Sequence, residues 1–285
     1  MSGYPEEQLA PGPEQTEIEQ DLNIATRTDL NGQTTYHILN RDRRSGMYTE
    51  KVYDWELNLV RVNKHSANSS SETHIDPKTG ATRQSFEASI LPDGSRMTKN
   101  IVYPDAEISR EEVVVVSPTG ELVRRVEREH IGMRTTFQSQ TEYRPDGLPA
   151  TTINHYTDLA TGSLTRREQI EWRDARHKTL KEEFIFDESG YLTRYSKVFY
   201  HSGAGPFIEE TKDYYPLSQQ LRRRVLATFN LEGSKTCEDR LEFNKSGKVI
   251  ERQSKFYDGL DTKPASHSSG TTCPNLFFSS LDAID

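Results

Sequence analysis

Apolar and polar side chains alternate with a period of two residues over most of this chain. Leu180, Glu182, Phe184 and Phe186 hold every second position of one such stretch. This period is typical of β-strands, because successive strand side chains point to opposite faces of a sheet. Only residues 217–229 also show helical spacing, and the strand rhythm on either side favours a strand there. The pattern therefore predicts an all-β protein.

A short turn pattern separates the alternating stretches and returns along the chain. In residues 186–192 an apolar residue is followed by Asp, two variable positions, Gly, one variable position and an aliphatic residue, and residues 243–249 repeat the pattern with Asn. Asp or Asn can open a tight turn, and Gly supplies the positive φ that closes it. Variants of the pattern occur at residues 90–94, 116–122, 143–148 and 229–233. Each unit predicts a β-hairpin.

The spacing of the turns predicts the size of the sheet. After Gly80, neighbouring turns are about 14 residues apart and equivalent turns about 28, which predicts roughly sixteen strands of about ten residues. Residues 63–73, rich in Ser and Asn, predict a surface loop or a seam between two parts. Open sheets rarely exceed about ten strands without curling. We therefore expect a long antiparallel meander of repeated hairpins in a curled or spiral single sheet, with a large soluble β-barrel or a two-layer sheet as the alternative.

Composition predicts three segments. Residues 1–25, rich in Glu and Pro, predict a disordered acidic tail, residues 26–258 the β-hairpin repeat domain, and residues 259–285 a flexible linker with an apolar carboxyl-terminal segment. That segment is predicted to bind a partner through Leu276, Phe277, Phe278 and Leu281. It could instead fold back on the sheet, or add to a sheet edge.

Charge and hydropathy exclude several classes of partner. The net charge of −8 lies in the two ends: residues 1–30 hold seven acidic residues and one Arg, residues 259–285 contribute −2, and residues 31–258 are neutral. A neutral body predicts no nucleic-acid or anionic-membrane surface. The chain has no apolar run of the roughly 18 residues that a spanning helix needs, and no basic-then-apolar leader. With only two cysteines, Cys237 and Cys273, we expect a reducing compartment and a soluble, cytoplasmic protein.

Residues capable of catalysis or metal binding show no pattern that predicts a site. None of the eight histidines pairs with another at metal-ligand spacing, and adjacent carboxylates such as Glu182-Glu183 point to opposite faces of a strand. We therefore predict no catalytic residue, no cofactor and no metal. The runs Arg166-Arg167 and Arg222-Arg223-Arg224 could bind a phosphate or an acidic partner, but we interpret them as cross-strand partners of Glu and Asp.

Aromatic residues recur at sheet positions. They predict the buried face of the meander, or a concave apolar surface for a ligand or protein. The residues are Tyr143, Tyr156, Trp172, Phe184, Tyr195, Phe199, Tyr214, Tyr215 and Tyr257.

The hairpin units of residues 80–258 resemble the tyrosine-aspartate repeats of the Rhs/teneurin type, and also the hairpin repeats related to MORN modules. The resemblance rests on the Gly, the apolar residue four positions before it and the aliphatic residue after it. The Tyr-Asp pair is present as Phe186-Asp187 and is replaced by Tyr143-Arg144 and Phe243-Asn244. The resemblance implies a scaffold fold and no activity.

These observations predict a non-enzymatic β-repeat scaffold, or protein-interaction module, that presents an extended sheet surface to a protein partner. The alternative is a carrier or enzyme that binds a small apolar ligand in a cavity of the curled sheet. The sequence leaves the oligomeric state open.

Overall fold

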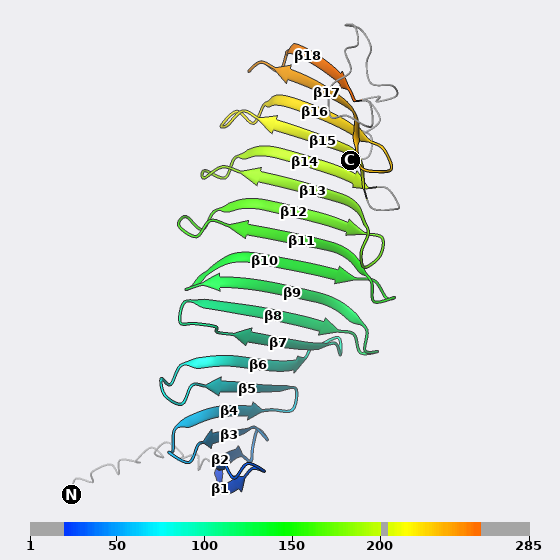
Figure 1. The fold of residues 1–285 in the computed structure, drawn as a ribbon. Helices are drawn as coiled ribbons and strands as arrows, with labels where there is room; N and C mark the ends of the chain where they lie inside the picture. Colours follow the sequence, from blue (N-terminus) through cyan, green and yellow to red (C-terminus); the bar gives the residue numbers. More distant parts are fainter. Residues whose placement is uncertain (1–19, 201–204, 258–285) are drawn as a thin grey trace, which may run out of the picture. The chain divides into compact units, whose positions relative to one another are not determined.

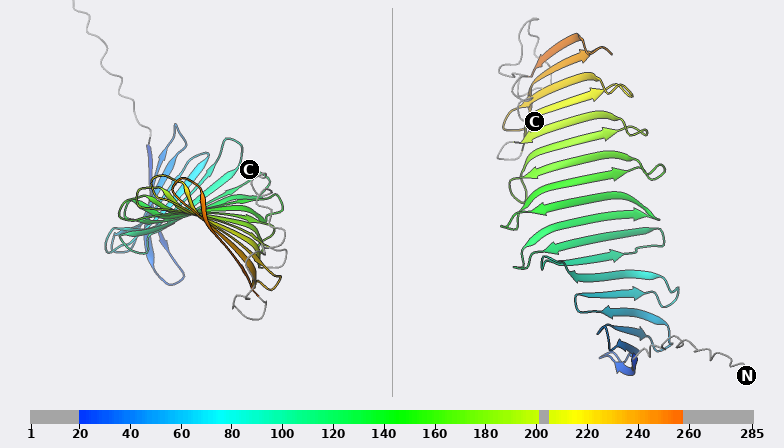
Figure 2. Two further views of the ribbon diagram at one scale, coloured as in Figure 1. Left: turned by 90° about the horizontal axis from the view of Figure 1, so that it is seen from above. Right: turned by 180° about the vertical axis from the view of Figure 1, so that it is seen from behind.

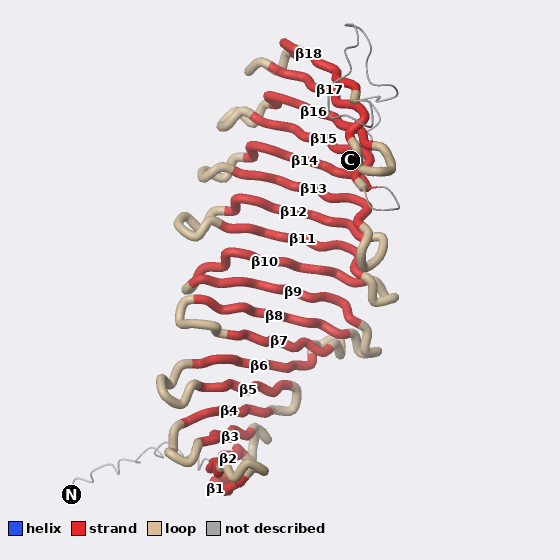
Figure 3. Tube along the Cα trace, viewed as in Figure 1, coloured by secondary structure: helices blue, strands red, loops and turns tan. Residues whose placement is uncertain are grey.

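The computed structural model describes residues 20–200 and 205–257, and in that part of the chain every regular element is a β-strand (Figures 1 and 3). The chain divides into two compact units, Met1–Glu87 and Ala88–Asp285. One strand, β6 (Thr82–Ile90), spans the division. The first unit otherwise contains β1 (Gln20–Thr28), β2 (Thr34–Asp42), β3 (Tyr48–Tyr53), β4 (Leu59–His65) and β5 (Ser69–Ile75).

Twelve strands follow in the second unit. They are β7 (Arg96–Val102), β8 (Ile108–Val116), β9 (Leu122–Ile131), β10 (Arg134–Tyr143), β11 (Pro149–Thr157), β12 (Leu164–Trp172), β13 (Lys178–Phe186), β14 (Leu192–Tyr200), β15 (Pro206–Tyr214), β16 (Leu221–Phe229), β17 (Lys235–Phe243) and β18 (Val249–Phe256). Seen from above, these strands fan out, as expected for a twisted sheet (Figure 2).

Within each unit, strands pair with their neighbours in the sequence. β1 to β5 pair successively and antiparallel, and so do β7 to β18. In the second unit the end strands β7 and β18 do not pair with each other, so the sheet formed by the described residues is open. The predicted all-β meander of repeated hairpins is confirmed, and the closed alternative is wrong for this unit.

The turn pattern read from the sequence has a direct structural cause. The Asp187 side chain accepts hydrogen bonds from the backbone N–H groups of Ser189 and Tyr191, both at 2.9 Å, and Gly190 donates to the carbonyl of Asp187 at 2.9 Å. Gly190 has a φ of 82°. The apolar residues on either side, Phe186 and Leu192, are paired across the hairpin, as predicted. The turn is therefore specified by local contacts alone.

The left-handed backbone at these turns predicts a measurable cost for side chains. Gly190→Val and Gly247→Val are each expected to lower the free energy of unfolding by about 1–2 kcal/mol, because both glycines have a positive φ. An added Cβ meets no heavy atom at either position, so the cost comes from backbone strain and not from a steric clash. Denaturant unfolding measures the loss, with Ser189→Val at an exposed neighbouring position as control. Losses below about 0.5 kcal/mol would contradict the turn assignment.

Two sequence boundaries differ from the structure. The predicted loop at residues 63–73 is wrong: β4 runs to His65 and β5 starts at Ser69. The turn between them is closed by Ser66, whose N–H donates to the carbonyl of Ser69 at 2.8 Å. Polar residues are compatible with strands here because most of them are only half-buried, and the buried Asn63 donates its side-chain amide to Glu50 at 2.7 Å. Strand β1 starts at Gln20, six residues before the predicted start of the repeat domain.

The second unit buries side chains on both faces of its sheet. Ile170 and Ala227 are buried on one face, and Leu226, Cys237 and Val126 on the other. A thick core requires a second layer, and among the described residues of this unit no such layer exists. Burial therefore comes from neighbouring side chains along each face.

Candidate functional site

The register assigns each side chain of β12 to β16 to one of two faces. Ile185 pairs with Arg194, Arg194 with Asp213, and Asp213 with Arg223, so all four share one face, here called face A. Residue 166 pairs with Ile185 and belongs to the same face. The opposite face, face B, carries the fully buried Leu226.

A buried carboxylate forms the centre of a polar cluster on face A. Glu168 is 5% exposed, and its Oε1 lies 2.8 Å from the Lys181 ammonium. Its Oε2 accepts hydrogen bonds from Asn154 and from the Tyr156 hydroxyl, both at 3.2 Å. Arg166 also pairs with Glu168. Since every oxygen of Glu168 has a partner, the charge is retained inside the sheet.

The cluster changes the acidity of Glu168. Burial alone raises the pKa of this carboxyl, but hydrogen bonds from Lys181, Asn154 and Arg166 outweigh burial and lower the pKa to about 2. The carboxylate therefore stays charged at neutral pH. A permanently ionised, fully bonded carboxylate stabilises structure and is a poor general acid.

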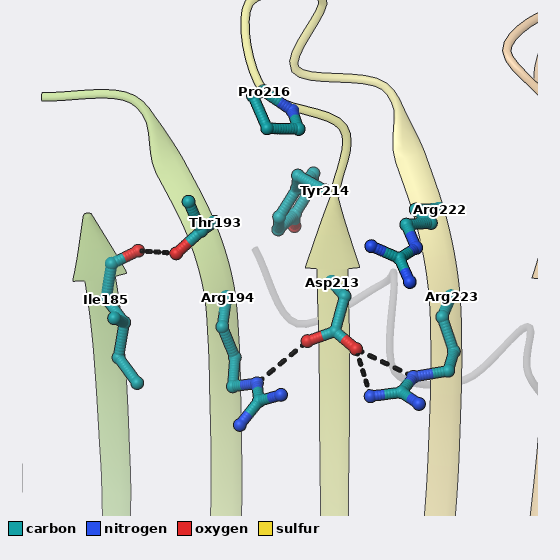
Figure 4. A pocket seen from close by; sticks show the side chains of 8 residues that line it. All are labelled: Ile185, Thr193, Arg194, Asp213, Tyr214, Pro216, Arg222 and Arg223. Carbon is teal, nitrogen blue, oxygen red and sulfur yellow. Dashed lines mark hydrogen bonds and ion pairs between the residues drawn. The ribbon is translucent and has the colours of Figure 1, made fainter. Parts of the chain in front are cut away.

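A pocket of about 350 Å³ opens on the second unit where β13 to β16 approach their turns (Figure 4). Its volume lies at the lower end of the roughly 300–1,000 Å³ typical of ligand sites. The lining residues are Ile185, Thr193, Arg194, Asp213, Tyr214, Pro216, Arg222 and Arg223.

Asp213 organises two of the arginines. Its Oδ1 lies 2.8 Å from Arg194 Nε, and its Oδ2 lies 2.7 Å from Arg223 Nε. Arg223 Nη2 also pairs with Oδ2. Both oxygens of the carboxylate are thus engaged, and the two guanidiniums are held on either side of Asp213 (Figure 4).

Arg222 lies at a position of the hairpin repeat that holds a threonine in two other hairpins. In the β11–β12 and β13–β14 hairpins the equivalent residues Thr165 and Thr193 sit at a β-bulge and donate a hydroxyl hydrogen bond to the facing strand, at 3.1 and 3.0 Å. The β15–β16 hairpin has its bulge at the same place, opposite Asp213, and Arg222 fills it. Arg222 is exposed and makes no ion pair or hydrogen bond with the described part of the chain.

The turn of the same hairpin departs from the repeat a second time. In the β11–β12 turn, Gly162 donates to Asp158 and has a φ of 75°. In the β15–β16 turn, Gln219 makes the equivalent bond to Tyr215 at 3.1 Å and has a φ of 54°. Leu217, in the same turn, has a φ of 67° and is 76% exposed. A positive φ at residues other than Gly strains the backbone and often marks a functional segment.

The arginines of the two runs noted in the sequence differ in their partners. Arg166, Arg223 and Arg224 form cross-strand ion pairs, so the interpretation of the runs as partners of Glu and Asp is confirmed for them. Arg224 lies on face B, where its Nε is 2.5 Å from Glu210. Arg167 and Arg222 are the exceptions: Arg167 donates to the Gln169 side chain at 3.3 Å and lies over the Phe184 ring, and neither residue forms an ion pair with the described part of the chain.

The aromatic residues do not form one surface. Tyr156 lies on face A, whereas Phe184 and Tyr195 lie on face B with ring centroids 5.0 Å apart. The prediction of a single buried or concave aromatic face is therefore wrong, because successive hairpins place their aromatics at positions of opposite parity.

The remaining predictions concern the carboxyl-terminal segment, metal binding and membrane spans. Leu276, Phe277, Phe278 and Leu281 lie outside the described residues, and their partner-binding role stays a prediction. Within residues 20–200 and 205–257, no group of three His, Cys, Asp or Glu residues could hold a metal ion. No helix in that part of the chain is long and apolar enough to cross a membrane.

Sequence reasoning did not single out Arg194 or Asp213. Both lie in ordinary alternating strands, and their meeting depends on the register of three strands. The change from Thr165 and Thr193 to Arg222 was the available signal, since these residues are 28 and 29 positions apart.

Comparisons with known proteins give no family. No family model matches the chain, and no curated protein matches it. Among solved structures, those titled "Crystal Structure of TcdB2-TccC3-TEV" and "Crystal Structure of TcdB2-TccC3" cover 83% and 81% of this chain, each with 9% identity and with TM-scores of 0.23 and 0.24. The matched part is only 16% of each of those longer chains. TM-scores this low support no inference about activity or partners.

Proposed function

We propose that this chain is a non-enzymatic β-repeat scaffold that binds a protein partner along the edge formed by the β9–β10, β11–β12, β13–β14 and β15–β16 turns. Exposed apolar residues at three of these turns support the proposal: Met133, Leu159 and Leu217. In an antiparallel meander, alternate turns lie on the same edge of the sheet (Figure 1). The turns therefore present a row of apolar side chains.

Leu217 carries the proposal. A leucine that is 76% exposed gains little burial energy, and a left-handed backbone costs about 1–3 kcal/mol. Leu217 therefore costs the free chain more stability than it provides. Contact with a partner would bury the leucine side chain and offset that cost. The alternative, a carrier of a small apolar ligand, finds little support in the pocket described above, because three arginines and an aspartate line it.

Leu217→Ser is expected to reduce binding of any partner that co-purifies with the full chain, without lowering the melting temperature. Leu231→Ser is the matched control, since Leu231 is 80% exposed in a turn on the opposite edge. Cross-linking mass spectrometry should place the partner near residues 133, 159 and 217. Equal binding by both variants would contradict the edge as the docking surface, and a co-purified small molecule in native mass spectra would favour the carrier.

A further inference from the structure

We propose that the pocket bounded by Arg194, Arg222 and Arg223 binds a phosphate group. This site goes beyond the scaffold role and does not depend on it, because anion binding can be measured with no partner present.

The charge of the lining is the first argument. The pocket has three guanidiniums and one carboxylate, which leaves a charge of +2. The nearest further carboxylate in the row, Glu242, pairs with Arg223 in register but binds Arg240, with Nε at 2.8 Å. The Arg240–Glu242 ion pair therefore adds no net charge beside the pocket. In the Glu168 cluster, by contrast, two cations face two carboxylates.

The geometry of the donors is the second argument. A guanidinium has five N–H donors, so Arg194, which gives Nε to Asp213, keeps both Nη groups for another acceptor. All five donors of Arg222 are available to a ligand from outside the described residues. Asp213 does not repel an anion strongly, because Arg194 and Arg223 already engage both of its oxygens. It instead fixes the two guanidiniums, which reduces the entropy that a ligand must overcome.

The charge of the ligand selects phosphate over carboxylate. A phosphate monoester carries about −1.5 to −2 at neutral pH and has three strong acceptor oxygens. It can therefore balance the pocket, whereas one carboxylate leaves a net positive charge. Arginine clusters of this kind are typical of phosphate recognition.

The repeat itself supplies the third argument. At the position of Arg222, threonine forms a hydrogen bond across the hairpin in β12 and β14. Arginine gives up that bond and makes no other with the described part of the chain. The same hairpin replaces the turn glycine by Gln219 at a positive φ. Arg222 lines the pocket, whereas Gln219 lies outside its lining and donates its side-chain amide to the Leu192 carbonyl at 3.3 Å. The loss of the hairpin hydrogen bond at Arg222 is the departure that a bound ligand would offset.

Isothermal titration calorimetry of the full chain with inorganic phosphate, and with acetate at equal ionic strength, tests the proposal. Phosphate is expected to bind more tightly than acetate. Arg222→Thr restores the residue of the neighbouring repeats, so it should fold at least as well as the parent and bind phosphate about tenfold more weakly or worse. Arg222→Lys should bind with intermediate affinity, because it keeps the charge and loses the fork.

Arg176→Gln is the control, since Arg176 is exposed in a turn of the same sheet and lies outside the pocket. It should bind phosphate as the parent does. Should Arg222→Thr fail to fold, Arg222→Gln gives the same comparison. A phosphoserine tripeptide distinguishes the source: binding tighter than inorganic phosphate points to a phosphorylated protein, and equal binding to a small anion. Equal affinity for acetate and phosphate, or undiminished phosphate binding by Arg222→Thr and Arg222→Gln, would overturn the proposal.

Discussion

Glu168→Ala is expected to lower the free energy of unfolding by about 3–5 kcal/mol. The substitution leaves Lys181 and Arg166 beside an empty position on face A, and removing one partner of a buried ion pair has a cost of this size. It also removes the acceptor for Asn154 and Tyr156. Urea unfolding at pH 7 measures the loss.

The pH dependence of stability provides the specific readout for Glu168. Its pKa is about 2 in the folded chain and ordinarily 4.5, so its contribution is complete above pH 4.5 and is lost as the pH falls toward 2. The variant should therefore lose less stability than the parent across that window. Glu188→Ala, at an exposed turn position, serves as control and should behave as the parent does. An unchanged pH profile in Glu168→Ala would contradict the role assigned to the cluster.

Leu226→Ala is expected to destabilise the chain by about 2–5 kcal/mol, the range found for large-to-small substitutions at buried sites. Leu226 is 1% exposed and lies on face B between Glu210 and Asp239 in register. Truncation would open a cavity beside two buried carboxylates, which the flanking Arg224 and Arg252 pair.

Thermal and denaturant unfolding should separate Leu226→Ala from Leu231→Ala, in which an 80% exposed side chain is truncated. The second variant should change stability by less than about 0.5 kcal/mol. Similar small losses in both variants would show that a single-layer sheet of this kind has no effective core on face B.

The hairpins could be predicted from the sequence because their causes are local. Asp187 and Gly190 define one turn within five residues, and the alternation around them specifies the strands. The polar stretch at residues 63–73 was misjudged for the same reason: Ser and Asn favour turns locally, but here they pair in β4 and β5, where no face is fully buried.

The candidate site could not be predicted in the same way. The pocket joins β13, β14, β15 and β16, and Arg194 and Arg223 meet only through Asp213, 19 and 10 residues away. The alternating pattern shows which residues of one strand share a face. It does not give the register between strands, and the register decides which side chains contact each other across the sheet. Comparing equivalent repeat positions, such as Thr193 and Arg222, carries more of that information than composition does.

The neighbour-to-neighbour pairing of β7 to β18 also has a kinetic consequence. Each strand contacts strands close to it in the sequence, so every new pairing closes only a short loop. The folding of the second unit can therefore start at any hairpin and propagate in both directions, as in other repeat proteins. At a hairpin with a strained turn, such as β15–β16, this propagation would be slower. A ligand bound beside that hairpin would change the rate at which the sheet opens as well as its stability.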